Sequence, residues 1–108
     1  MKAEWFLNYH DIPDLLQNWL VGLGVRDPER AGRDVRDLIK KAGPGCLTLI
    51  AKLAVQLDGV LPRCPDPGMA LSNLERYLAA GPEHEPTLRK LVDNPRTTEI
   101  LLQVFSTS

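Results

Sequence analysis

Apolar side chains recur every three or four residues along most of the chain, which is the period of an amphipathic α-helix. No stretch alternates apolar and polar residues at period two, as a half-buried strand would. The pattern predicts an all-α fold of five or six short helices joined by brief proline- and glycine-containing links. The predicted helices cover residues 13–23, 28–42, 46–59, 67–80 and 87–92 and the chain after Asn94-Pro95.

The segment 46–59 has the most apolar pattern and is predicted to be the core helix. Before Asp58 and Gly59 at its end, only Thr48, Lys52 and Gln56 interrupt it, and these three fall on one narrow strip of the helix. A helix of this kind is expected to have neighbours on most sides. The aromatic cluster at residues 5–9 is expected to form one irregular turn that covers the end of the core.

Three of the predicted helices start with the same local signature, an Asp-Pro or Asn-Pro pair. The acidic or amide side chain can accept a hydrogen bond from a free backbone amide, and proline lacks the N–H that would stay unpaired there. The pairs are Asp27-Pro28, Asp66-Pro67 and Asn94-Pro95. Gly24 is expected to end the first of the predicted helices in the left-handed conformation. Residues 61–67, with three prolines, are expected to form an extended loop.

The last helix is apolar over more than half of its circumference, whereas a surface helix normally buries a stripe of about 100°. Its apolar residues are Ile100, Leu101, Leu102, Val104 and Phe105. We expect Ile100, Leu101 and Val104 to turn inward and Leu102 and Phe105 to remain exposed. Leu102 and Phe105, together with the neighbouring Leu101, are the candidate interaction residues. Self-association of the isolated chain through residues 99–108 is expected to follow.

A chain of 108 residues has the size of one domain, so 1–108 is interpreted as a single helical domain. Its net charge of −1 gives no long-range field that would gather nucleic acid or an anionic membrane, and neither is an expected partner. The N-terminus is not followed by the apolar segment of a signal peptide. These features predict a cytoplasmic protein.

The polar face of segment 28–42 carries five basic residues, which could form a phosphate-binding strip. Acidic residues are interleaved with them at every turn, and the spacing favours pairs such as Glu29–Arg33, Arg30–Asp34 and Asp37–Lys41. This arrangement is more typical of a solvated helix surface.

Cys46 and Cys64 are the only cysteines, and both are expected to be free thiols. Cys46 opens an apolar helix and is predicted to be buried, whereas Cys64 stands among prolines and is predicted to be accessible. The cysteines and the histidines, His10 and His84, lack the spacing of a zinc finger or ribbon. No phosphate-binding glycine loop or serine-nucleophile motif is present either, so we predict no catalytic, cofactor-binding or metal-binding residue.

Two stretches of the C-terminal part resemble a known family. They are Ala70-Leu71-x-Asn73-Leu74-x-Arg76-Tyr77-Leu78, and Asn94-Pro95 leading into Leu101-Leu102-x-Val104-Phe105-x-x-Ser108. Together they resemble the helical region ahead of the first nucleotidyltransferase domain in the glutamine synthetase adenylyltransferase family. That family attaches AMP to a tyrosine of glutamine synthetase and removes it. Its Gly-Ser-Asp-x-Asp motif, whose carboxylates hold Mg²⁺, has no counterpart here, so ATP and Mg²⁺ would belong to a separate catalytic domain.

The resemblance implies a non-catalytic N-terminal segment of an adenylyltransferase-like protein, with the chain continuing beyond Ser108. Its partners would be the rest of the parent protein or a second copy, and glutamine synthetase would be reached through the parent. The alternative is a freestanding helical module that docks another protein. Reading the coding sequence past Ser108 for the Gly-Ser-Asp-x-Asp motif separates these two hypotheses.

Overall fold

The structure is a computed structural model that describes residues 1–107, and these residues form seven α-helices, two 3₁₀ turns and no strand. The helices are α1 (Ala3–Tyr9), α2 (Pro13–Gly22), α3 (Pro28–Ala42), α4 (Leu47–Val60), α5 (Pro67–Ala80), α6 (His84–Asp93) and α7 (Pro95–Phe105). The all-α prediction is confirmed. The structure has one helix more than expected, because residues 5–9 belong to the regular helix α1 instead of an irregular turn.

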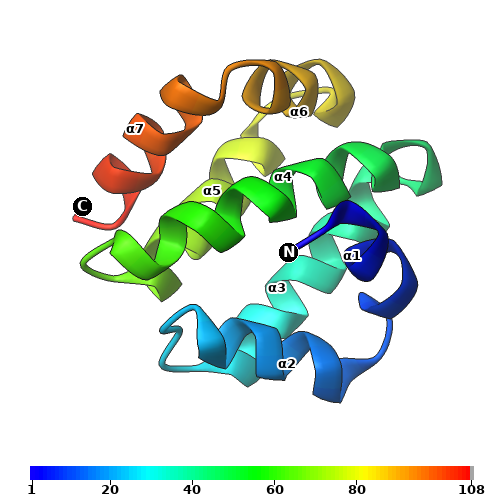
Figure 1. Cartoon of the computed structure of the whole chain (residues 1–108). Helices are drawn as coiled ribbons and strands as arrows, with labels where there is room; N and C mark the ends of the chain where they lie inside the picture. Colours follow the sequence, from blue (N-terminus) through cyan, green and yellow to red (C-terminus); the bar gives the residue numbers. More distant parts are fainter. Residues whose placement is uncertain (108) are drawn as a thin grey trace.

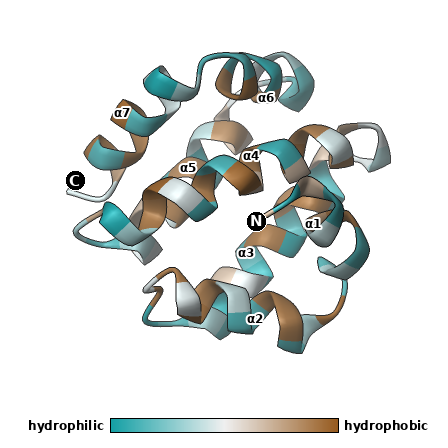
Figure 2. Cartoon of the chain, viewed as in Figure 1, coloured by the Kyte–Doolittle hydropathy of each residue, from teal (hydrophilic) through white to brown (hydrophobic). Residues whose placement is uncertain are grey.

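Helix α4 lies at the centre of the molecule, as its apolar pattern predicts. It packs against α1 and α6 and also contacts α3 and α7. Figure 1 shows α4 crossing the middle, with α6 and α7 on one side and α2 and α3 on the other. Ala51, Leu53 and Ala54 are almost completely buried. Helices α4 and α5 both carry long hydrophobic stretches, while the outer turns of α6 are hydrophilic (Figure 2).

Two of the three predicted helix caps are formed. The Asp27 carboxylate accepts a hydrogen bond from the Arg30 amide (3.2 Å), and the Asp66 carboxylate accepts one from the Met69 amide (3.0 Å). Asn94 does not cap α7, because its side-chain amide donates to the carbonyl of Lys90 in α6 (2.8 Å). Gly24 ends α2 with a φ of +92°, the left-handed conformation that the sequence predicts.

Two links between helices differ from their predictions. The loop expected to be extended over residues 61–67 begins with a 3₁₀ turn, Leu61–Arg63, which buries Leu61 completely. Helix α6 starts at His84 instead of Thr87, so the break before it is shorter than the Gly-Pro-rich sequence indicates. In both places proline occupies an early position of a helical turn, where its missing N–H costs nothing.

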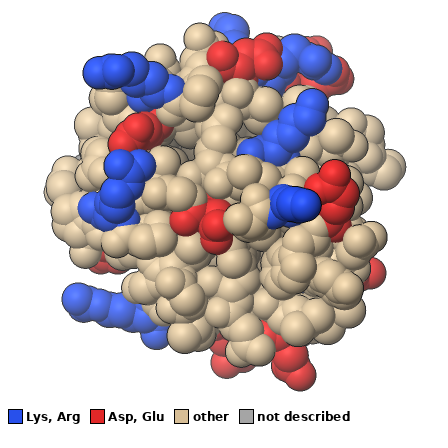
Figure 3. Space-filling view, viewed as in Figure 1, with Lys and Arg blue, Asp and Glu red and all other residues tan. Residues whose placement is uncertain are grey.

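The polar face of α3 points into solvent, with Ala31, Val35 and Leu38 buried on the opposite side. The i,i+4 pairs expected on this face are not within ion-pair distance in residues 1–107; Lys41 instead lies 3.9 Å from Glu75 of α5. Figure 3 shows both charge signs interspersed over the visible surface, with no continuous patch of one sign. Such isolated exposed charges contribute little to stability.

The N-terminal helices are attached to α4 through an aromatic cluster. Phe6 is buried, with its ring centroid 5.9 Å from that of Trp19, and Trp5 lies 6.5 Å from Trp19. The indole N–H of Trp19 donates to the carboxylate of Asp58 near the end of α4 (2.9 Å). The Met1 ammonium contacts the other oxygen of the same carboxylate (3.2 Å). Asp58 therefore links both α1 and α2 to the central helix.

Candidate interaction surface on helix α7

The inward face of α7 is formed by Thr98, Leu102 and Ser106, which are spaced one turn apart. Their side chains are 1%, 0% and 3% exposed. The Thr98 hydroxyl donates to the Leu91 carbonyl (2.6 Å), and the Ser106 hydroxyl donates to the Gln103 carbonyl (2.8 Å). Because both hydroxyls have acceptors, burying them carries no unpaired polar group into the core. These three residues therefore determine which face of α7 points into the core.

The opposite face leaves two aliphatic side chains in solvent. Ile100 is 58% exposed and Val104 is 54% exposed. They lie one turn apart, so they are neighbours on the helix surface. We name the surface formed by Arg96, Glu99, Ile100, Gln103 and Val104 the α7 outer face; these residues line a shallow hollow of about 470 Å³.

This arrangement contradicts the exposure expected for three residues of the helix. Leu102 is completely buried, while Ile100 and Val104, which were expected to turn inward, are exposed. Leu101 is half-buried against the core. Phe105 is also half-buried: its ring lies 5.8 Å from that of Tyr77, and its carbonyl accepts from the Asn73 side chain (2.8 Å).

Tyr77 itself is 44% exposed, although the apolar pattern of residues 67–80 would place it on the inward side with Leu74 and Leu78. The apolar pattern alone does not identify the buried face of α7, because Thr98 and Ser106 on that face are polar. Their four-residue register with Leu102 was the signal in the sequence that could have identified the buried face.

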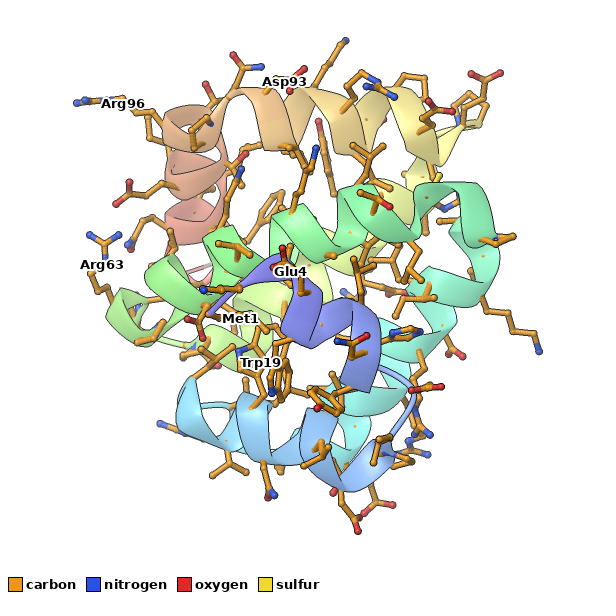
Figure 4. The ribbon with its side chains drawn as sticks, turned by 45° about the vertical axis from the view of Figure 1, so that its right-hand side comes forward. Met1, Glu4, Trp19, Arg63, Asp93 and Arg96 are labelled. Atoms are coloured by element: carbon orange, nitrogen blue, oxygen red, sulfur yellow. The ribbon has the colours of Figure 1, made fainter. Side chains whose placement is uncertain are left out.

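The charges around the α7 outer face are only partly matched. Arg63 lies 3.1 Å from Glu99, and both side chains are substantially exposed. Across residues 1–107, no carboxylate lies within ion-pair distance of Arg96. In Figure 4, Arg96 and Arg63 both project outward from the side of the molecule where α7 lies. Arg96 occupies the first turn of α7, and the last turn contains no basic residue.

Cys64 lies beneath α7 and is 7% exposed, so the prediction that it is accessible is wrong. The turn Leu61–Arg63 directs its thiol inward, 3.6 Å from the Val60 carbonyl and 4.0 Å from the Leu102 carbonyl. Burial raises the pKa of the Cys64 thiol, and this effect outweighs the lowering influence of the nearby Ser106 hydroxyl. Cys46 is buried as predicted, and both cysteines are free thiols.

The other residues considered for chemistry do not converge. The His10 ring contacts the carbonyls of Phe6 and Leu7 at the end of α1, as a helix cap would. His84, which precedes the helix predicted over residues 87–92, is half-buried at the start of α6, and its Nε2 has no hydrogen-bond partner within residues 1–107. In the same part of the chain, no three His, Cys, Asp or Glu side chains are grouped closely enough to hold a metal ion.

A second hollow, of about 420 Å³, lies between the start of α3 and the start of α5. Arg30 and Arg76 line it together with Asp27, Asp34 and Asp66. Both signs alternate there, and two of the carboxylates are already hydrogen-bonded to helix amides. This hollow therefore contains no cluster of positive charge that would support a phosphate-binding role for α3.

One stretch, Pro44–Arg63, is long and apolar enough to cross a membrane by length and composition. Half of this stretch is buried inside the protein. The central helix of a folded core meets the same criteria, so the stretch carries no assignment.

Comparison with known proteins adds no further assignment: no family model, no curated protein and no solved structure matches this chain.

Proposed function

We propose that this chain is a non-catalytic helical domain that docks another protein surface through the α7 outer face. The observation that carries the proposal is the exposure of Ile100 and Val104, side by side on a helix whose other side closes the core. Apolar side chains grouped on a surface and surrounded by polar residues are characteristic of interaction sites.

As the setting for this activity we propose the N-terminal segment of a cytoplasmic glutamine synthetase adenylyltransferase-like protein. Support comes from the way the residues of the resemblance meet one another. Leu74 and Leu102 are both buried, and helices α5 and α7 pack against each other, with Asn73 hydrogen-bonded to Phe105. The pattern thus corresponds to one packed helix pair. Ser108, its last residue, lies outside the described residues.

In this proposal the chain positions the catalytic domain of the parent protein and supplies no ligand for ATP or Mg²⁺. Incubation with labelled ATP, Mg²⁺ and glutamine synthetase should give no more label on the target than a control without the chain. Labelled glutamine synthetase above that control would overturn the non-catalytic assignment.

The docking part of the proposal is tested with a family adenylyltransferase from which the helical N-terminal segment has been removed. The chain should bind this truncated enzyme, and Val104→Glu should abolish binding. Val21→Glu is the matched control, because Val21 is 56% exposed but lies on α2. Absence of binding by the unchanged chain would overturn the adenylyltransferase setting.

A freestanding interaction module is the second candidate, favoured by the burial of Leu102 inside the chain's own core. A helix end that needed a further helix of the parent for its main contacts would leave this side chain open. Reading the coding sequence past Ser108 for Gly-Ser-Asp-x-Asp decides between the two settings, and the α7 outer face has the same role in both.

A further inference from the structure

We propose that the α7 outer face binds a second copy of this chain through an antiparallel pair of α7 helices. The inference rests on the proposed function only in taking this face as a docking surface. Two features of α7 specify the partner: the place of its single basic residue along the helix, and the spacing of its two exposed aliphatic side chains.

Arg96 occupies an unfavourable place within its own helix. The first turn of a helix carries the positive end of the backbone dipole, where a cation is disfavoured and an anion is preferred. The first turn of α7 has no acidic residue and the last turn has no basic residue, so the helix lacks the usual charge compensation at both ends. A second α7 packed antiparallel supplies this compensation at both ends, because each Arg96 then lies beside the negative C-terminal end of the other helix.

A parallel pair has the opposite electrostatic result. It would place the two Arg96 side chains next to each other, and no carboxylate in residues 1–107 lies within ion-pair distance to neutralise either of them. Like charges side by side on neighbouring helices are destabilising. The charge pattern therefore selects the antiparallel orientation.

The aliphatic residues fit the same symmetry. A two-fold axis that passes between Ile100 and Val104 sets Ile100 of one copy against Val104 of the other, twice over. Such an isologous contact buries all four exposed side chains with one surface. The net charge of −1 per chain adds little repulsion between copies.

The size of the contact makes the association weak. The face is one helix wide over the 11 residues of α7, which is far less than the roughly 800 Å² per partner that a stable complex buries. We expect a dissociation constant on the order of 0.1–1 mM. The chain is therefore expected to form a reversible dimer, populated only at high local concentration.

Sedimentation velocity between about 20 µM and 1 mM tests the proposal. The unchanged chain should show a concentration-dependent rise in mean mass, and Val104→Glu should weaken the association by at least about tenfold. The α2 control, Val21→Glu, should leave it unchanged. A strict monomer at about 1 mM, or association that survives Val104→Glu, overturns the proposal. Because binding to the truncated adenylyltransferase is measured separately, a monomeric chain that still binds that enzyme keeps the docking function and eliminates only the second copy.

Two further variants test the orientation. Arg96→Glu should weaken association and leave the thermal stability of the monomer equal or higher, because an acid suits the first turn of a helix. A mixture of Ile100→Cys and Val104→Cys chains should form mixed disulfides faster than either variant alone; the native cysteines are buried and do not interfere. Faster crosslinking between identical variants indicates a parallel pair and overturns the antiparallel arrangement.

Discussion

The hydroxyl of Thr98 donates a hydrogen bond of 2.6 Å to the backbone carbonyl of Leu91. In a continuous helix that carbonyl would accept from the backbone N–H four residues later, but the residue there is Pro95, which has none. Thr98 thus supplies the donor that the proline removes. Because the Thr98 hydroxyl replaces this missing backbone donor, a polar side chain can occupy the inward face of α7.

Replacing Thr98 with valine keeps the shape of the side chain and removes this donor. We expect Thr98→Val to lower the free energy of unfolding by about 1–3 kcal/mol, because the Leu91 carbonyl is left without its partner. Chemical denaturation measures the change. Thr97→Val is the control, since Thr97 is exposed in the same turn and should change stability by less than about 0.5 kcal/mol. Equal effects of the two variants would contradict the role assigned to Thr98.

Leu102 and Val104 should respond to truncation in opposite ways. Leu102→Ala empties a completely buried site and is expected to cost about 2–5 kcal/mol of stability. Val104→Ala, on the outer face, should cost less than about 0.5 kcal/mol. Leu102→Glu, which the phase expected from the sequence would make a surface change, should prevent folding because it buries an unpaired carboxylate. If circular dichroism shows that the Leu102→Glu chain is folded, Leu102 does not lie on the buried face of α7.

The two thiols should both be protected in the folded chain. We expect a thiol reagent to modify Cys46 and Cys64 at similarly low rates in the native state and rapidly after unfolding, since both are buried. Mass spectrometry of quenched samples measures the two rates separately. Fast modification of Cys64 alone would contradict its burial and support the accessible loop that the sequence predicts.

The raised pKa of Cys64 also has a consequence for stability at high pH. A thiol whose pKa is higher in the folded state than in the unfolded state stabilises the folded chain fully below the unfolded value of about 8.5. This contribution is lost as the pH rises from there towards the folded value. Denaturation of the unchanged chain and of Cys64→Ala between about pH 7 and 10 should show a steeper loss of stability for the unchanged chain. Parallel curves would contradict the shift.

Asp58 should be important as a hydrogen-bond acceptor for Trp19. Asp58→Ala leaves the half-buried indole N–H without its partner and is expected to cost about 1–2 kcal/mol, with a change in tryptophan fluorescence. Asp58→Asn retains an oxygen in the same place and should cost clearly less. A chain in which both variants have equal stability would show that the contact is not formed.

The sequence predicts those helices best in which local chemistry and apolar pattern agree. In α3, the Asp27 cap, the Pro28 start and the stripe of Ala31, Val35 and Leu38 all indicate the same boundaries and the same buried face. In α4 the narrow polar strip identifies the central helix directly. Here the capping, the pattern and the packing are all local properties of a single segment.

The candidate site was harder to predict because α7 is apolar on most sides. An apolar arc wider than half a turn does not determine which part faces the core. That choice depends on groups outside the helix, namely the Leu91 carbonyl, which accepts from Thr98, and the surface that α5 offers to Phe105. The burial of Cys64 is hard to predict for a similar reason: its flanking prolines indicate a surface loop, but α7, distant in the sequence, covers the thiol.

The central position of α4 has a consequence for synthesis on the ribosome. Helices α1, α2 and α3 leave the exit tunnel first, yet the surface on which α1 rests and the acceptor for Trp19 both belong to α4. Until α4 emerges, α2 and α3 can already pack against each other, whereas α1 lacks the helix that it contacts most. The order of translation therefore leaves the apolar side of α1, with Phe6, without its main packing surface until α4 has left the ribosome.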